Sequence, residues 1–348
     1  MISNTRIVRT NTLDPWWNLS IEEYLLDTVE PGQCILYIWQ NENTIVIGRN
    51  QNPWKECRTE VFEKEGGRIA RRLSGGGTVF HDIGNLNFTF VADRQLYDLN
   101  KQLKVILDAV SGLGIDAEMT GRNDLLADGR KFSGNAFCFR ANTAYHHGTL
   151  LISSDLDKLS RYLQVSAEKL KTKGIASISS RVINLSELKP DLTTEDMAQA
   201  LIEAFRSNYG CSAPVENAQK SPNIDRDTIE NLYCKYSSWK WRYGEAPQFD
   251  ADFETRFSWG ELELGLKLEN GLVSQTTVYS DAMDEACIAV IPQLLNGCEF
   301  NSRKLAERLM IAEVPFPERI GPQEMWNNAV CSKAMLSDIA KWLEAKQF

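Results

Sequence analysis

The chain has 348 residues, of which 43% are hydrophobic and 24% charged, a composition ordinary for a soluble globular protein, and this length predicts two domains. A net charge of −9 disfavours non-specific attraction to nucleic acid or anionic membranes, and no apolar run reaches the roughly 18–20 residues of a membrane span. The first residues hold no hydrophobic secretory core, and the eight cysteines form no CxxC pair. We therefore expect a reducing compartment and no structural zinc site.

The first third of the chain mixes helical and strand-like runs. Residues 13–27 predict a helix, with Asp14 as its N-cap and Pro15 in its first turn. Two β-rich runs, 34–40 and 44–50, are separated by Asn-Glu-Asn and predict a hairpin. Further strands are expected at 67–73, 78–82 and 86–92, and a helix at 99–114.

The next segments continue this pattern. An Asp128–Gly129 turn is expected to join two strand-like runs within 125–139, and another strand is expected at 145–153. Helices are expected at 155–163 and 193–210. This part of the chain therefore predicts a mixed β-sheet with helices around it.

A polar stretch with Gly and Pro, 241–255, predicts the boundary between two domains, 1–246 and 252–348. Beyond it, leucines at alternate positions from 262 to 268 share one face of a strand, and Asn270-Gly271 predicts a hairpin turn. Two or three helices follow. This small α+β domain contains none of the histidines, so we expect it to pack against, recognise or close over the first domain without taking part in the chemistry.

The segment ARRLSGGGTVFHDIGN, residues 70–85, contains three consecutive glycines, which are costly in a regular element and need a reason. Bare backbone can bring N–H groups close to a phosphate or carboxylate, and Arg71 and Arg72 could offer forked donors to the same anion. A tight hairpin is the alternative explanation, but it leaves the arginines unexplained. No lysine follows the glycines, so the segment is not a P-loop.

The three histidines of the chain, His81, His146 and His147, all lie close to glycines. They show neither HxH nor HExxH spacing, which makes a metal site built from them a weak hypothesis. Structural histidines remain the alternative.

Two further segments carry polar side chains. The first, 121–137, contains Asp124, which could hold a magnesium ion, and Lys131 at the start of a strand. The second, 169–185, is basic and rich in hydroxyls. It is either a solvated loop or a flap that orders when nucleotide binds.

Five motifs in order along the chain, RRLSGGGTVFHDIGN, GRNDLL, RKFSGNAF, HHGTLL and KGIASISSRVINL, resemble those of the lipoate–protein ligase A family. DPWWNLSIEEYLL and GRNQNPWKEC are similar to that family as well. The resemblance covers nearly the whole chain, and the ordered set is specific although each motif alone is weak. At the position of Thr78, alanine is commoner in the family. The β-branched threonine suits a strand, so we expect little consequence.

The resemblance implies an α/β (α+β) fold, in which a mixed β-sheet flanked by helices, as in biotin and lipoate protein ligases, carries a small α+β C-terminal domain. It also implies a cytoplasmic enzyme that uses ATP and Mg²⁺ to convert free (R)-lipoate to lipoyl-AMP. The lipoyl group then passes to a lysine of an acceptor, either a lipoyl domain of a 2-oxoacid dehydrogenase E2 subunit or the glycine-cleavage H protein. No tightly bound prosthetic group, nucleic acid or membrane is expected.

The resemblance also assigns residues. Lys131 is the catalytic electrophile, touching both the acyl carbonyl and the phosphate; Asp124 is the candidate magnesium ligand. Trp39, Val79 and His81 form the lipoate pocket wall. The full lipoate- and ATP-binding set is Arg71, Ser74, Gly75, Gly76, Gly77, Thr78, Val79, His81, Asn123, Asp124, Lys131, Ser133, Gly134, His147, Gly148, Lys173 and Gly174.

Three alternatives stay open: an ATP-independent octanoyl or lipoyl transferase that forms a thioester on Cys138, a non-catalytic module that sequesters an acylated protein or cofactor, and biotin as the acyl substrate. If no bulge intervenes, strand alternation places Lys131 and Ser133 on the face opposite Cys138, so we expect a structural thiol. The preference between lipoate and octanoate, the acceptor and the oligomeric state are left open by the sequence.

Overall fold

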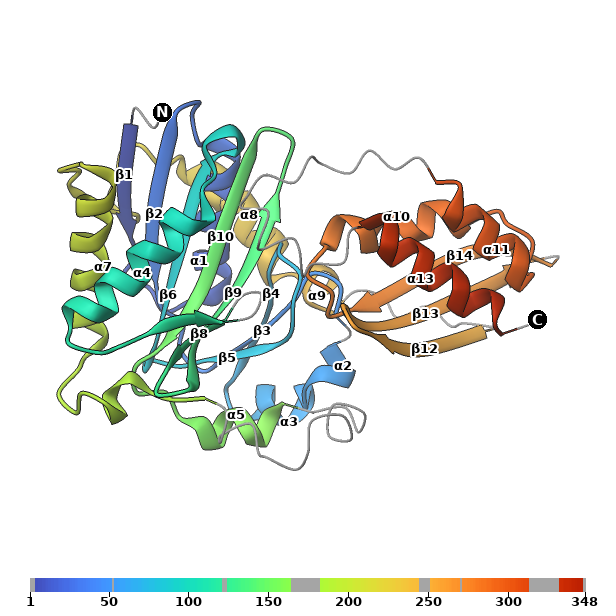
Figure 1. Cartoon of the computed structure of the whole chain (residues 1–348), viewed down its shortest axis with the longest axis horizontal. Coiled ribbons are helices and arrows are strands. Elements are labelled where there is room, and N and C mark those ends of the chain that lie inside the picture. Colours follow the sequence, from blue (N-terminus) through green and yellow to red (C-terminus); the bar gives the residue numbers. More distant parts are fainter. Residues whose placement is uncertain are drawn as a thin grey trace.

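The computed structural model describes residues 4–51, 53–120, 124–163, 182–243, 251–269, 271–312 and 332–346. It consists of a larger unit built on a mixed sheet flanked by helices and a smaller unit built on a three-stranded sheet (Figure 1). This confirms the predicted fold class. Residues 244–250, the middle of the predicted boundary stretch, lie outside the described ranges.

An eight-stranded sheet of order β11-β1-β2-β6-β10-β9-β8-β7 forms the centre of the larger unit. β1 pairs in parallel with β2 and β11, and the remaining pairs are antiparallel. The strands are β1 (Asn4–Arg9), β2 (Gln33–Trp39), β6 (Asn85–Asp93), β7 (Glu118–Thr120), β8 (Asp124–Ala127), β9 (Arg130–Phe139), β10 (Thr143–Leu151) and β11 (Val215–Asn217).

Helices cover both faces of this sheet. On one face, α1 (Pro15–Thr28) packs with α8 (Arg226–Ser237); on the other, α4 (Leu99–Gly112) packs with α7 (Thr194–Tyr209). Alternate residues of β2 therefore enter two different cores, and the whole strand is buried. The predicted start of α1 is confirmed, because the Asp14 carboxylate accepts hydrogen bonds from the first two free N–H groups of the helix.

A second sheet of order β4-β3-β5 lies beside the large one and contains β3 (Thr44–Ile47), β4 (Arg68–Arg71) and β5 (Val79–His81). The predicted hairpin between 34–40 and 44–50 is wrong, because β2 belongs to the large sheet and β3 to the small one. The short segment between them carries the chain from one sheet to the other, and both edges of β3 are filled by strands that follow later.

The glycine-rich segment does not close a tight hairpin either. β4 and β5 both pair with β3, in parallel and antiparallel orientation, and not with one another. The glycines therefore cross from one side of β3 to the other, which excludes the hairpin explanation. The short helices α2 (Pro53–Glu56), α3 (Thr59–Lys64) and α5 (Leu156–Tyr162) lie near this sheet (Figure 1).

The hairpin between β8 and β9 is confirmed. Asp128 and Gly129 adopt φ angles of 51° and 68°, the left-handed conformation that a two-residue turn of this type requires. The pairing then slips, because Leu125 faces Ser133 while Leu126 faces Lys131. Phe132 is thus the extra residue of a β-bulge, a feature that changes which face the following side chains occupy.

The smaller unit contains β12 (Ala251–Phe257), β13 (Gly260–Glu269) and β14 (Leu272–Ser280), paired antiparallel in that order. Among the described residues, this sheet is covered by the helices α10 (Glu285–Leu295), α11 (Ser302–Met310) and α13 (Ser332–Glu344). Leu262, Leu264 and Leu266 are fully buried beneath them, which confirms the predicted alternation. The remaining described elements are η1 (Arg94–Leu96), η3 (Leu185–Glu187) and α9 (Trp239–Arg242).

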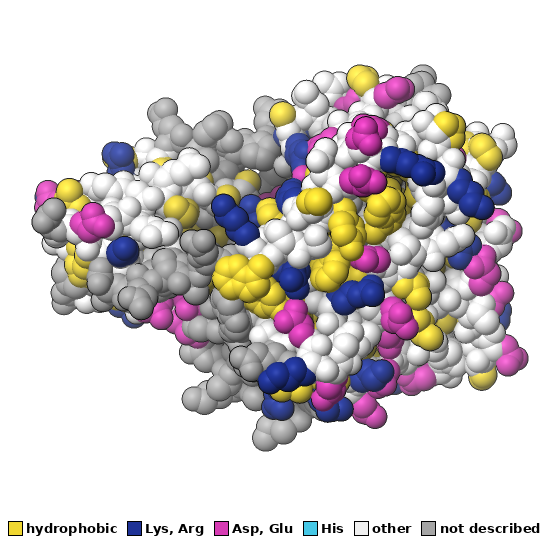
Figure 2. Space-filling model, turned by 180° about the vertical axis from the view of Figure 1, so that it is seen from behind, with side chains coloured by type: hydrophobic (Ala, Val, Ile, Leu, Met, Phe, Trp, Pro, Cys, Tyr) yellow, Lys and Arg dark blue, Asp and Glu magenta, His cyan; other side chains and the backbone are white. Residues whose placement is uncertain are grey.

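Seen from behind, hydrophobic side chains gather near the middle of the molecule, with Lys and Arg side chains among them (Figure 2). Aromatic residues of α1 and α8 pack together, with Trp16 and Trp17 each 6.3 Å from the ring of Tyr233. The Arg242 guanidinium lies 5.2 Å from the centre of the Trp16 ring. This cation–π contact stabilises the packing of Arg242 on the aromatic cluster. None of the helices in the described ranges combines the length and apolar character needed to cross a membrane.

Candidate active site

A cavity of about 190 Å³ lies where the two sheets of the larger unit meet a loop of the smaller unit. Its walls come from α1, β2, β3, the glycine-rich segment, β5, β6, β9 and β10, and one residue comes from the smaller unit. The lining residues are Leu19, Trp39, Val46, Arg72, Gly76, Gly77, Thr78, Val79, His81, Asn87, Lys131, Gly134, Asn135, Ala136, His147, Gly148, Thr149 and Met283. The structure therefore brings together most of the site residues predicted from the sequence.

Two of the glycines are required by close packing. A Cβ atom on Gly75 would lie 2.4 Å from the Ala282 carbonyl oxygen, and Gly76, with φ of +85°, donates its N–H to that oxygen at 3.2 Å. Gly77 has open space where a Cβ would stand. Gly75 and Gly76 thus allow the Ala282 carbonyl of the smaller unit to approach the segment closely. Gly77 instead presents backbone without a side chain to the cavity.

This close packing gives a stability prediction. We expect Gly75→Ala to separate the Ala282 carbonyl from the glycine segment and to lower the free energy of unfolding by about 1–3 kcal/mol, since the buried Gly76 N–H would lose its acceptor. Gly77→Ala is the matched control and should change stability much less. Urea unfolding of both variants is the measurement; equal losses would contradict the prediction.

The two neighbouring arginines have different surroundings. Arg72 lines the cavity and holds the glycine segment from within: Nη2 donates to the carbonyls of Gly75 and Gly77 at 2.8 and 2.7 Å, and Nε donates to the Ser74 hydroxyl at 3.0 Å. Burial lowers the Arg72 pKa to about 10, so the side chain keeps its charge near neutral pH. Arg72 therefore brings a fixed positive charge to the cavity.

Arg71 does not line the cavity, although the sequence analysis placed it in the substrate-binding set. Adjacent strand residues point to opposite sides, and the Arg71 guanidinium is turned away. Its nitrogens donate to five backbone carbonyls at 2.8–3.0 Å, those of Gly48, Arg49, Gln51, Trp241 and Arg242. Arg71 thus joins three segments of the chain, and the structure gives Arg72 the position expected of Arg71.

A buried hydrogen-bond network fixes the wall formed by His147. The ring Nδ1 lies 2.8 Å from Glu22 Oε1, and Nε2 lies 2.8 Å from the Ser74 hydroxyl. The same Glu22 oxygen accepts from Thr89 at 2.7 Å, and Thr89 accepts from the Trp39 indole N–H at 3.0 Å. A carboxylate oxygen only accepts, so Nδ1 of His147 donates to Glu22; in the neutral ring, Nε2 then accepts from the Ser74 hydroxyl.

Ser74, His147 and Glu22 have the connectivity of a hydrolase triad, but the geometry of the cavity assigns them another role. Ser74 is fully buried and does not line the cavity. Its hydroxyl donates to His147 and accepts from Arg72. It cannot reach a substrate carbon without breaking this network, so the three residues hold the cavity wall in place. Glu22 was not among the site residues predicted from the sequence. The feature that could have revealed it is an acidic residue among the apolar residues of a buried helix.

Lys131 and Asp124 form an ion pair with Nζ and Oδ1 2.7 Å apart, and their side chains are 36% and 38% exposed. Lys131 lies against Gly134, where a Cβ would stand 3.0 Å from Nζ. Two other side chains that line the cavity are far less exposed: Trp39 and His81 are each 3% exposed. The lysine therefore marks the mouth of the cavity, and the two aromatic rings mark its enclosed end.

The β-bulge overturns the argument that Cys138 faces away from Lys131. Because Phe132 is the extra residue, Lys131 shares the face of Gly134 and Ala136, and alternation places Cys138 on that face too. The thiol is nevertheless buried, and burial together with Glu285 raises its pKa well above the usual value. These surroundings are the reverse of those that activate a nucleophilic thiol.

Several predicted residues lie elsewhere. Ser133 is fully buried, does not line the cavity and accepts from the Asn135 amide at 3.4 Å. Thr78 does line the cavity, and its hydroxyl donates to Gln51 Oε1 at 2.9 Å. Asn123, Lys173 and Gly174 fall outside the described residues, as does most of the segment 169–185.

A family model of the lipoyl protein ligase A/B catalytic domain matches residues 14–206, and one of the bacterial lipoate protein ligase C-terminus matches residues 246–327. Among solved structures, LipL1 of P. falciparum in complex with lipoate is 28% identical, with a TM-score of 0.81 over 98% of this chain and 99% of that chain. This similarity extends over both units of the molecule.

Two further structures share the fold of the larger part. The bi-partite lipoate protein ligase of Thermoplasma acidophilum, described with its E2 lipoyl domain, is 24% identical with a TM-score of 0.59, over 71% of this chain and 99% of that one. A lipoate-protein ligase A bound with ATP is 23% identical with a TM-score of 0.56, over 70% and 99%. Since the catalytic-domain model alone spans more than half of the 348 residues, the chain belongs to the lipoate–protein ligase family of enzymes, with the C-terminal part of its bacterial members.

Proposed function

We propose that this enzyme is an ATP-dependent lipoate–protein ligase that forms lipoyl-AMP and then transfers the lipoyl group to a lysine of an acceptor protein. The observation that carries the proposal is the cavity, whose enclosed apolar end can hold an acyl chain while Lys131 and bare glycine backbone stand at the other end. The lipoate bound in LipL1 and the ATP bound in lipoate-protein ligase A support the two substrates.

In the first step a carboxylate oxygen of lipoate attacks the α-phosphorus of ATP, and the bond to the departing pyrophosphate breaks. Two anions meet in this step, and negative charge is spread over the phosphoryl oxygens in the transition state. Fixed positive groups aimed at those oxygens lower the barrier most. Lys131 at the mouth and Arg72 behind the glycine segment supply such charge.

In the second step the acceptor amine attacks the carbonyl carbon of lipoyl-AMP, and AMP leaves with the bonding electrons. The amine loses a proton to water. Lys131 is placed to donate a hydrogen bond to the acyl carbonyl oxygen in both steps, so it acts as an electrophile and forms no covalent bond. The His147 wall, fixed by Glu22 and Ser74, keeps the acyl chain in line with this lysine.

Magnesium would enter with ATP. The cation prefers oxygen ligands and completes its shell with water and substrate phosphates, so a single carboxylate at the mouth is a suitable protein ligand. Asp124 is a half-exposed carboxylate at that place and already neighbours the lysine that would meet the phosphate. We therefore keep Asp124 as the residue that would hold the ion, which would offset phosphate charge.

Lipoyl domains are the acceptors we propose first, because the Thermoplasma ligase is described together with its E2 lipoyl domain. The H protein is the second proposed acceptor, and the cytoplasm is the proposed compartment. The test is to incubate the enzyme with a purified lipoyl domain, lipoate and MgATP and to measure the mass of the domain. We expect the mass of one lipoyl group, dependent on ATP and lost when the acceptor lysine is changed to arginine; an ATP-independent gain from an octanoyl donor would contradict it.

Cys138→Ser separates this ligase from a cysteine-dependent transferase. We expect the variant to keep most of its activity with free lipoate and ATP, because the thiol is buried and its pKa is raised by burial and Glu285. Mass spectrometry of the wild type after incubation with an octanoyl donor should show no hydroxylamine-sensitive adduct on this residue. A stable thioester together with an inactive Cys138→Ser variant would favour the transferase.

A further inference from the structure

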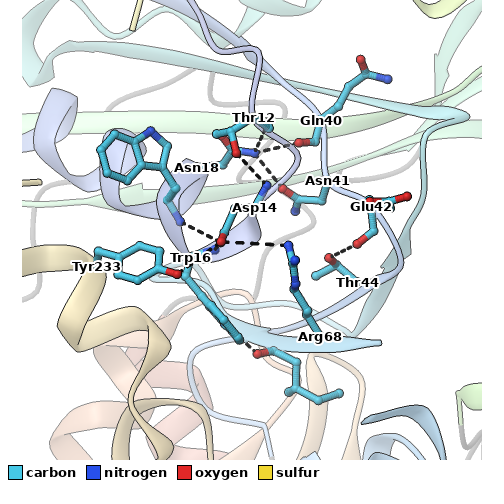
Figure 3. A network of polar contacts seen from close by, with 12 residues as sticks. Thr12, Asp14, Trp16, Asn18, Gln40, Asn41, Glu42, Thr44, Arg68 and Tyr233 are labelled. Carbon is cyan, nitrogen blue, oxygen red and sulfur yellow. Dashed lines mark hydrogen bonds and ion pairs between the residues drawn. The ribbon is translucent and has the colours of Figure 1, made fainter. Parts of the chain in front are cut away.

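A chain of side-chain amides leads from the start of α1 to the cavity. Asn18 Nδ2 lies 3.2 Å from the Thr12 carbonyl oxygen, 2.7 Å from that of Gln40 and 3.0 Å from Asn41 Oδ1 (Figure 3). Backbone carbonyl oxygens can only accept, so the atom that faces them must be the amide nitrogen of Asn18. Its Oδ1 accepts from the Tyr37 hydroxyl at 3.3 Å, which agrees with this orientation.

The orientation of Asn18 determines that of Asn41. Because Asn18 donates to Asn41 Oδ1, the other end of the Asn41 amide is the NH₂ group, and this group lies 3.1 Å from His81 Nδ1. An amide NH₂ only donates, so Nδ1 must be the unprotonated nitrogen of the ring, and the proton of the neutral imidazole sits on Nε2. The backbone carbonyls of Thr12 and Gln40 thus fix the orientation of Asn18. Through Asn41, that orientation sets the tautomer of His81.

His81 is held neutral as well as oriented. Burial, and then the charges of Arg72 and His147, lower its pKa to about 3, so the ring stays uncharged over the working range of an enzyme. Among the described residues, its Nε2 has no hydrogen-bond partner, although the side chain is only 3% exposed and lines the cavity. A buried donor left without an acceptor costs about 1–3 kcal/mol. This N–H is therefore available to a bound ligand.

The position of His81 indicates which part of the ligand it meets. The ring lies edge-on to Trp39, with 6.1 Å between centroids, at the enclosed end of the cavity, whereas the half-exposed Lys131 marks the mouth. The carboxyl group must lie at the mouth, where it reacts with the nucleotide. The enclosed end then receives the far end of the acyl group, which is a dithiolane in lipoate and a methyl in octanoate.

We propose that Asn41 is a positioning residue that holds His81 in the Nε2–H tautomer, and that this N–H selects an acyl group with a divalent sulfur at its far end over a plain saturated chain. The proposal rests on the proposed ligase function and deepens it. Sulfur is a weak acceptor, but it partly satisfies the buried donor, whereas a methyl group leaves it unpaired. A site built around a donor discriminates in this way against an analogue that lacks the acceptor.

The first test is ¹⁵N NMR of the full chain labelled at histidine, which is tractable because the chain has three histidines. We expect a protonated Nε2 and an unprotonated Nδ1 for His81 in the wild type. Asn41→Asp offers His81 an acceptor in place of the donor and should move a proton onto Nδ1. A wild-type His81 protonated at Nδ1 would overturn the proposal whatever the enzyme's substrate.

The second test compares kcat/KM for lipoate and for octanoate in ATP–pyrophosphate exchange. Asn41→Leu should lower the lipoate-to-octanoate ratio by about fivefold to tenfold, the range expected for a weakly satisfied donor. Gln40→Leu is the control, because it also replaces a side-chain amide by leucine at the neighbouring position. The Gln40 side chain donates to the Ile83 carbonyl, and its loss should leave the ratio unchanged. An unchanged ratio in Asn41→Leu would overturn the selection by sulfur.

The two tests also separate this proposal from the proposed function. Absence of exchange with every acyl substrate in the wild type would contradict the ligase function. The His81 tautomer measured by NMR would still test whether Asn41 positions this ring. If Asn41→Leu fails to fold, His81→Leu removes the same donor, and its lipoate-to-octanoate ratio should fall in the same way. A ratio equal to that of the wild type would then overturn the selection.

Discussion

Lys131→Ala should reduce lipoate-dependent adenylation by about 10²–10³-fold, because it removes a donor aimed at the charge that develops on the phosphoryl and acyl oxygens. The side chain is half-exposed and paired with Asp124, so its loss should leave the fold intact. The measurement is the rate of pyrophosphate exchange, with circular dichroism and thermal unfolding as checks of the fold.

Two further variants sharpen this expectation. Lys131→Arg keeps the charge but should restore the rate only in part, since a planar fork does not fill the place of a compact ammonium group packed against Gly134. Lys104→Ala removes a lysine that is 62% exposed and pairs with Asp108, and it should behave like the wild type. A near-normal exchange rate in folded Lys131→Ala protein would refute the role given to this lysine.

Arg71→Met should destabilise the enzyme by about 3 kcal/mol or more, because five backbone carbonyls lose their charged donor at a buried position. The loss should appear as a lower midpoint of urea unfolding. Arg71→Lys should recover little of the stability, since an ammonium group cannot reach five acceptors on two separate segments at once.

Arg303→Met is the matched control for this loss. Arg303 is 78% exposed and pairs with Glu307 one helical turn away, an arrangement whose removal changes stability by less than about 0.5 kcal/mol. If Arg71→Met unfolds like the wild type but loses its affinity for the acyl substrate or ATP, the structural role is wrong and Arg71 belongs to the binding site after all.

Local signals in the sequence were sufficient where one segment decides its own structure. Asp14 and Pro15 mark the start of α1, and Asp128–Gly129 turns the chain between β8 and β9. The hairpin expected between 34–40 and 44–50 failed because pairing partners are chosen at long range. Here β3 finds β4 and β5, which lie further along the chain, and two β-rich runs around a polar turn cannot reveal that choice.

The same limit applies to the site. The glycine segment, His81 and Lys131 stand out in the sequence because their residue types carry the chemistry, and they line one cavity. Glu22 and Asn41 were missed because each acts through a partner brought close only by the fold. Glu22 contacts His147 from 125 positions away, and Asn41 contacts His81 from 40 positions away.

Neither the choice between the two arginines nor the face of Cys138 could be read from the sequence. Arg71 and Arg72 are chemically equal, and only the direction of β4 tells which one enters the cavity. The face of Cys138 depends on a single extra residue, Phe132, in β9. A bulge of this kind shifts every side chain beyond it, and nothing in the residue types announces it.

The most direct test of the central claim is ATP–pyrophosphate exchange by the wild-type enzyme without any acceptor protein, measured in parallel with lipoate, octanoate and biotin. An adenylating ligase must exchange labelled pyrophosphate into ATP whenever its acyl substrate is present, because the first step is complete before an acceptor binds. We expect exchange that depends on lipoate and Mg²⁺ and is absent with biotin. No exchange with lipoate by folded enzyme, together with acyl transfer from an octanoyl donor in the absence of ATP, would contradict the account.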